Sequence, residues 1–188
     1  MKQPSKHPKV GIEGSWEDEV SDVEQMRRWH ESAFQAALEK VREGHGNAET
    51  LMQTGEAFGR GLFSQKMQEK THQWTVGEWL EKAEENVLSP LRTEFTFTRT
   101  SPDAATLFIE RNPLAGQAKE STVASLFMYG VIRGLFQSAF PEGELLCKGA
   151  FIGDSSELIL KTHASQSDRS ERERVKRLFT IVKKNHNP

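Results

Sequence analysis

The sequence predicts an α+β fold in which helices pack on one face of a four-stranded antiparallel sheet. Apolar residues recur at three- and four-residue steps in several segments, which is typical of amphipathic helices. Two further pairs of short segments carry strand patterns, and each pair is joined by a turn. Strands that arrive as adjacent pairs favour antiparallel pairing. The expected order is helix, helix, helix, hairpin, helix, hairpin, followed by a basic helix.

The length, charge and cysteine content exclude several classes of protein. The chain has 188 residues and a formal net charge of -2, which suits one domain and argues against a dedicated nucleic-acid binder. The single cysteine, Cys147, allows no internal disulfide and no cysteine-cluster metal site. We expect no metal and no cofactor.

No segment has the pattern of a secretory signal or of a membrane span. The basic N-terminus is not followed by an apolar stretch. The most apolar segment, residues 123–136, is interrupted by Arg133 and is shorter than the ~20 residues that a spanning helix needs. We therefore expect a cytoplasmic protein.

Composition divides the chain into three parts. Residues 1–20 contain prolines, glycines and a change of charge sign, which predicts a flexible lead-in. Residues 21–163 hold the periodic segments and form the single α+β domain. Residues 164–188 read as a polar linker and a basic C-terminal helix.

The first two helices are expected before residue 71. Ser21 or Asp22 can cap the first, and Gly44 and Gly46 follow its end. Its apolar positions are Val23, Met26, Trp29, His30, Phe34, Ala37, Leu38 and Val41. The second helix is expected over residues 48–70 and contains three glycines, each unfavourable by about 1 kcal/mol relative to alanine. Close packing of another backbone against that face is the simplest reason for Gly55, Gly59 and Gly61.

A short helix over residues 76–87 precedes the first hairpin. Residues 93–99 and 105–111 carry strand patterns, and Ser101-Pro102-Asp103 makes the turn. Asn112-Pro113 then ends the second strand.

The next helix, residues 121–139, is apolar on nearly all sides, so we place it centrally. Gly130 and Gly134 stand about one turn apart on it, and their lack of side chains allows a strand or another helix to approach closely. Residues 144–152 and 156–163 read as the second hairpin. The segment from Asp168 to Lys184 has seven basic and three acidic residues, a charge of +4.

Several short patterns resemble the 4-vinyl-reductase-type domain, whose superfamily includes the Bet-three-like subunits of transport complexes. The resemblance covers roughly residues 22–163. Two of the patterns are helices that contain spaced glycines, at residues 55–62 and 129–136. The other two are Asn112-Pro113, which follows the first hairpin, and the Gly-Asp turn with its strand at residues 153–160.

The resemblance implies a homodimer with an apolar pocket between the helices and the sheet. In relatives this pocket holds a small apolar molecule or lipid chain, or is filled by side chains. Relatives that bind zinc usually carry a cysteine directly after the Gly-Asp turn. Ser156 and Glu157 stand there in this chain, so zinc chemistry is not carried over.

The candidate ligand-binding residues are apolar side chains of the expected sheet and central helix: Phe95, Phe97, Phe127, Phe136, Cys147 and Phe151. The alternative interpretation is that they are simply core. Cys147 reads best as a small buried side chain. A nucleophile–base pair of Cys147 with His163, or a three-ligand zinc site with Glu157 and His163, remains an alternative, although Glu157 and His163 have opposite strand parity. His30 and His72 are expected at the surface or at a boundary.

Three functional hypotheses follow. The first is a non-enzymatic domain that binds a small apolar molecule or acts as a scaffold, as a homodimer. The second is a small hydrolase or reductase with a pocket around Cys147. The third is an assembly factor that acts through its surface alone. The basic C-terminal helix would contact a protein partner or pack on its own domain, and no nucleic acid is expected.

Overall fold

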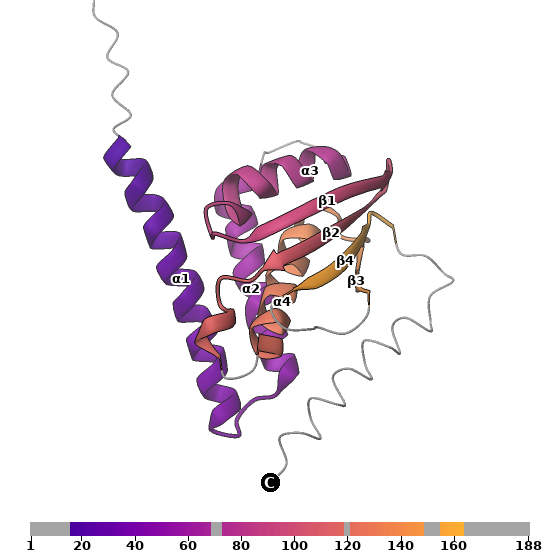
Figure 1. The fold of residues 1–188 in the computed structure, drawn as a ribbon. Helices are drawn as coiled ribbons and strands as arrows, with labels where there is room; N and C mark the ends of the chain where they lie inside the picture. Colours follow the sequence, from indigo (N-terminus) through magenta and orange to yellow (C-terminus); the bar gives the residue numbers. More distant parts are fainter. Residues whose placement is uncertain (1–15, 69–72, 119–120, 149–154, 164–188) are drawn as a thin grey trace, which may run out of the picture.

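The computed structural model describes residues 16–68, 73–118, 121–148 and 155–163. Its helices and strands follow the expected order, and the α+β fold class is confirmed (Figure 1). The elements are α1 (Trp16–Arg42), α2 (Ala48–Leu62), α3 (Val76–Ala83), β1 (Glu94–Ser101), β2 (Ala104–Arg111), α4 (Ser121–Ala139), β3 (Glu144–Cys147) and β4 (Ser156–Lys161), with short turns of π-helix at Phe63–Met67 and Glu84–Leu88 and of 3-10 helix at Ala115–Gln117.

The four strands form one antiparallel sheet with the order β1-β2-β4-β3. Both expected hairpins are present, and the second one docks so that β4 pairs with β2. The expected turn between β3 and β4 and the outer part of the strand expected to residue 152 lie outside the described residues. The buried apolar residues of β2 and β4 stand directly opposite each other, as in the pair Leu107 and Leu158.

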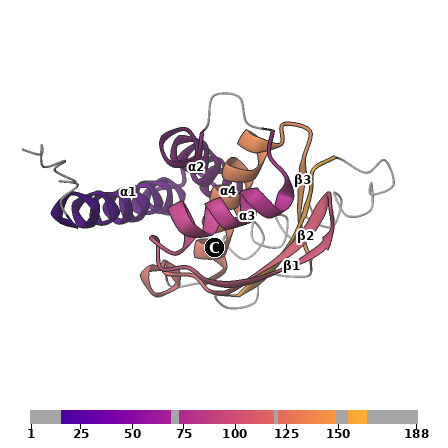
Figure 2. The same ribbon diagram turned by 90° about the horizontal axis from the view of Figure 1, so that it is seen from above.

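The helices cover one face of this sheet, with α4 in the middle (Figure 2). Thirteen of the residues of α4 are buried, which agrees with its expected central position. One side of α4 meets the sheet and another side meets α2. No described helix covers the opposite face of the sheet.

Helix α1 begins at Trp16, so the expected cap at Ser21 or Asp22 is wrong. The acidic residues Glu17, Asp18 and Glu19 lie in the first turn of the observed helix. The helix therefore includes residues 16–20, which we expected in the lead-in.

The next two helices begin with reciprocal side-chain caps and end in π-turns. The Asn47 side chain accepts hydrogen bonds from the N–H groups of Glu49 and Thr50, at 2.9 and 3.2 Å. Thr75 and Glu78 form the equivalent capping box before α3. The π-turns carry the helical path to Met67 and Leu88, close to the expected ends. The expected basic C-terminal helix lies outside the described residues.

No helix of the described residues is both long enough and apolar enough to cross a bilayer.

Candidate ligand-binding interior

Helices α2 and α4 touch through their backbones, because four glycines face each other across the contact. A β-carbon added at Gly55 or Gly59 would lie 2.2 or 2.1 Å from the carbonyl oxygen of Phe127 or Val131. A β-carbon at Gly130 or Gly134 would lie 2.1 Å from a carbonyl oxygen of α2. Only hydrogen atoms fit in these positions. The expected close approach is confirmed for both helices.

Gly61 does not belong to this contact. It is exposed, and nothing lies within 4 Å of a β-carbon built there. The expectation that close packing explains all three glycines of α2 is therefore wrong for Gly61. Spacing alone could have separated them, since Gly55 and Gly59 are four residues apart and share a face.

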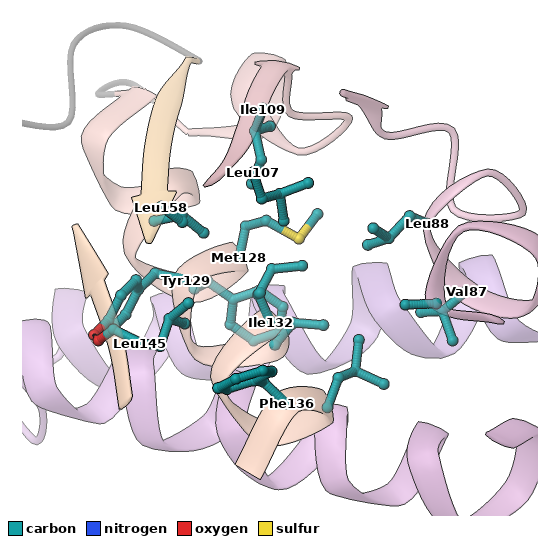
Figure 3. Packing of buried hydrophobic residues seen from close by; sticks show 14 of the residues in the cluster. Val87, Leu88, Leu107, Ile109, Met128, Tyr129, Ile132, Phe136, Leu145 and Leu158 are labelled. Atoms are coloured by element: carbon teal, nitrogen blue, oxygen red, sulfur yellow. The ribbon is translucent and has the colours of Figure 1, made fainter. Parts of the chain in front are cut away.

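The opposite side of α4 packs against the inner face of the sheet, and we name this region the sheet-side layer. It consists of Met128, Ile132 and Phe136 of α4 with Leu107, Ile109, Leu145 and Leu158 of the sheet (Figure 3). These side chains are buried, and they point toward each other from the two elements. Val87 and Leu88 border the same layer from the turn after α3. An apolar molecule bound between helices and sheet would have to lie here.

Two polar side chains mark the β3 end of the sheet-side layer. The Tyr129 hydroxyl donates a hydrogen bond to the carbonyl oxygen of Leu145 at 2.9 Å. Burial raises the pKa of Tyr129 to about 12. Cys147 is 4% exposed and stands opposite Leu158 in the sheet. Burial, and then the nearby Glu157 carboxylate, raise the pKa of the Cys147 thiol to about 11.

These pKa values weaken the enzymatic alternative. A thiol with a pKa of about 11 is almost entirely protonated at neutral pH, and the thiolate is the reactive species. The side chains of Cys147 and Glu157 lie on opposite faces of the sheet, because Leu158, the neighbour of Glu157, is the residue opposite Cys147. Among the described residues, no three metal-ligating side chains are grouped.

The structure distributes the candidate ligand-binding residues over three regions. Phe136 belongs to the sheet-side layer, and Cys147 lies at its β3 end. Phe127 points to the other side of α4, where its ring lies 5.4 Å from that of Phe34 on α1. Phe95 and Phe97 belong to the inner side of β1, and Phe97 is 38% exposed. Phe151 lies outside the described residues.

His30 is buried, so the expectation that it lies at the surface or at a boundary is wrong. It is 2% exposed, and its ring lies 5.5 Å from Phe58 of α2 and 5.7 Å from Phe127 of α4. Burial lowers the pKa of His30 to about 4, and its Nε2 atom has no hydrogen-bond partner among the described residues. His72, expected at a similar boundary, lies outside the described residues.

The neighbour of His30, Trp29, is 44% exposed, although the periodic pattern included both. A stricter pattern separates them. Buried residues of α1 follow four-residue steps through Met26, His30, Phe34 and Leu38, and Trp29 falls off this row.

Comparison with known proteins identifies the fold. No family model matches the chain, and no curated protein matches it. Among solved structures, the chain is similar to trafficking protein particle complex subunit 3 from Naegleria fowleri, which was crystallised covalently bound to palmitic acid. The identity is 13%, the match covers 73% of this chain and 94% of that chain, and the TM-score is 0.50. The chain therefore shares its fold with this solved structure, and the Bet-three-like resemblance noted in the sequence is confirmed at the level of the fold.

Proposed function

We propose that the protein is a non-enzymatic domain that acts as a homodimer and holds a small apolar molecule or acyl chain in its interior. The observation that supports this most is the sheet-side layer, an apolar interface between α4 and the sheet. Ligand sites of this kind are lined by apolar side chains with few polar groups. A structural neighbour with the same fold carries palmitic acid, which gives the expected class of ligand.

The ligand would be held without a covalent bond. Cys147 is the single cysteine of the chain, and its buried thiol with a raised pKa is a poor nucleophile for acylation. The Tyr129 hydroxyl and the Cys147 thiol would instead lie at the polar end of the sheet-side layer. Apolar surface of the ligand then provides most of the binding free energy.

Native mass spectrometry of the freshly purified full-length chain tests the proposal. We expect a dimer that carries an apolar compound, and we expect denaturation to release that compound at its unmodified mass. A dimer without a passenger would contradict ligand binding. A monomer would contradict the homodimer.

Two variants on neighbouring residues of β2 locate the ligand. Ala105 is fully buried on the inner face of the sheet, whereas Ala104 is partly exposed on the outer face. Ala105→Leu should reduce binding of a fluorescent fatty acid, and Ala104→Leu should not, with circular dichroism as a check on folding. Cys147→Ser should bind the fatty acid as the unchanged protein does. Equal binding by both alanine variants would exclude the inner face as the site.

A purely surface-acting assembly role is the second candidate, and Trp29 favours it. An exposed tryptophan in the middle of a long helix is costly in water and is typical of interfaces. Trp29→Ser should then dissociate the dimer or a protein partner in sedimentation experiments, while circular dichroism should show that the helix content is unchanged. Retention of the same assembly in the variant would exclude a role for this residue.

A further inference from the structure

The outer face of the sheet carries an exposed aromatic side chain. In β2, Leu107 and Ile109 point inward and are buried, whereas Phe108 between them points outward and is 41% exposed. Thr96 is directly opposite Phe108 on β1, and the partly exposed Ile159 lies two residues from its partner on β4. This face is not covered by any described helix (Figure 2).

Two carboxylates flank Phe108 on this face. Glu110 follows two residues later on the same strand and is exposed. Glu157 stands directly opposite Phe108 on β4, and Lys148 contacts it at 2.9 Å. A segment that covers Phe108 should therefore combine an apolar side chain with neighbouring positive charge.

Residues 164–188 have this combination and follow β4 in the chain. The described chain ends just after β4, where the Thr162 N–H donates a hydrogen bond to the Asp103 carbonyl at 2.9 Å. In the following sequence, apolar residues recur at helical spacing: Val175, Leu178, Phe179 and Val182. Lys176 and Lys183 stand three residues before and four residues after Phe179, so a helix would place both beside its ring.

We propose that residues 170–184 lie across the outer face of the sheet, with Phe179 on Phe108 and the flanking lysines facing Glu110 and Glu157. The lengths agree with this arrangement. A helix of this length spans roughly 22 Å, and the eight residues of β2 span roughly 26 Å. The residues between His163 and Ser170 can extend about 20 Å, which is enough to reverse the chain direction at the end of β4.

Disulfide trapping in the full-length chain tests the contact. The test pair is Phe108→Cys with Phe179→Cys. The control pair is Phe97→Cys with Phe179→Cys, because Phe97 is 38% exposed, nearly the same as Phe108, but points to the inner side of the sheet. Cys147 stays in both chains and is buried. Mild oxidation is followed by non-reducing electrophoresis at several protein concentrations.

We expect an intrachain disulfide in the test pair to form at least about tenfold faster than in the control pair and at a rate independent of concentration. Equal rates in the two pairs would overturn the proposal. Predominant interchain disulfides would also overturn it and would assign the outer face to a second copy of the chain.

A double-mutant comparison gives a readout that does not depend on oxidation. Phe108→Ser and Phe179→Ser should each lower the urea midpoint, and the combined variant should lose no more than the larger of the two. Phe97→Ser combined with Phe179→Ser should lose the sum of its single effects. Additive losses for Phe108 and Phe179 would show that the two rings do not meet.

Discussion

Helices α1 and α2 both pack against α4, but they do so by different means. Helix α2 meets α4 backbone to backbone through Gly55, Gly59, Gly130 and Gly134. Helix α1 reaches α4 through long side chains, with Phe34 and His30 resting on Phe127. The first contact leaves no space for one additional carbon atom. The second contains a polar atom, His30 Nε2, for which the described part of the chain provides no hydrogen-bond partner.

The difference indicates which contact fixes the fold and which can be adjusted. A backbone contact tolerates no substitution, because moving one helix moves every residue attached to it. A side-chain contact can repack, and here its strength depends on the protonation of one imidazole. We therefore expect the α2–α4 contact to respond to steric change and the α1 contact to respond to pH.

The largest effect is expected from Gly59→Ala. Its new β-carbon would lie 2.1 Å from the Val131 carbonyl oxygen, so the helices must separate. The free energy of unfolding should fall by about 3 kcal/mol, within the range for overpacked cores. Urea denaturation measures it. Gly61→Ala in the same helix is the matched control and should increase stability by about 0.5–1 kcal/mol, because nothing opposes its β-carbon. Similar values for the two variants would contradict the backbone contact.

A comparable effect is expected from His30 as the pH falls. The pKa is about 4 in the folded protein and 6.5 in the unfolded chain, so the unfolded state binds the proton first. Above pH 6.5 the residue adds no pH dependence. Between pH 6.5 and pH 4 it should lower the free energy of unfolding by up to about 3 kcal/mol.

The His30→Leu variant isolates this contribution, because leucine does not titrate. Unfolding of both proteins is measured from pH 7.5 to pH 4. As the pH falls, the free energy of unfolding of the leucine variant should rise relative to that of the unchanged protein. A difference that stays constant over this range would mean that His30 is accessible to protons in the folded state.

Removing the cap of α2 should have a smaller effect. The Asn47 side chain satisfies two backbone N–H groups at the start of the helix. Asn47→Ala should lower the free energy of unfolding by about 1 kcal/mol. Asn47→Asp keeps an acceptor oxygen and should restore most of the loss. Failure of aspartate to rescue the alanine variant would exclude capping as the cause.

The smallest effect is expected at the rim of the α2–α4 contact. Arg133 of α4 lies 3.5 Å from a carboxylate oxygen of Glu56 on α2, and the arginine side chain is partly exposed. Arg133→Gln should lower the free energy of unfolding by less than about 1 kcal/mol, because water screens this ion pair. The loss should shrink further in 1 M salt. A loss as large as that of Gly59→Ala would show that charge, rather than backbone contact, holds these helices together.

Much of this fold could be predicted because local patterns and local structure agree. The alternation of apolar and polar residues around Phe95 and Phe97 predicts the first hairpin. The apolar residues on nearly all sides of α4 predict its central position. The four-residue glycine spacing on two helices predicted a close approach before any partner helix was known. Each of these inferences rests on the period of the backbone, which is a local property.

Other features depend on which helices and strands contact each other. Periodicity includes both Trp29 and His30 among the apolar positions of α1. Only the positions of Phe58 and Phe127 around the histidine show that His30 is the buried one. Phe127 and Phe136 are both candidate pocket residues because both are aromatic. Their positions on α4 place Phe127 against Phe34 and Phe136 against Trp79. The order of the strands was also open, because hairpin patterns do not specify which hairpin edges pair.

The sequence by itself determined the fold class, the order of the elements and the two glycine-bearing faces, because the helix and strand periods can be recognised from residues close together in the chain. The tertiary structure decided the burial of His30, the high pKa of the Cys147 thiol and the exposure of Phe108 on a sheet face that no described helix covers. Burial and electrostatic environment arise from residues distant in the chain, and they exist only after the elements have packed.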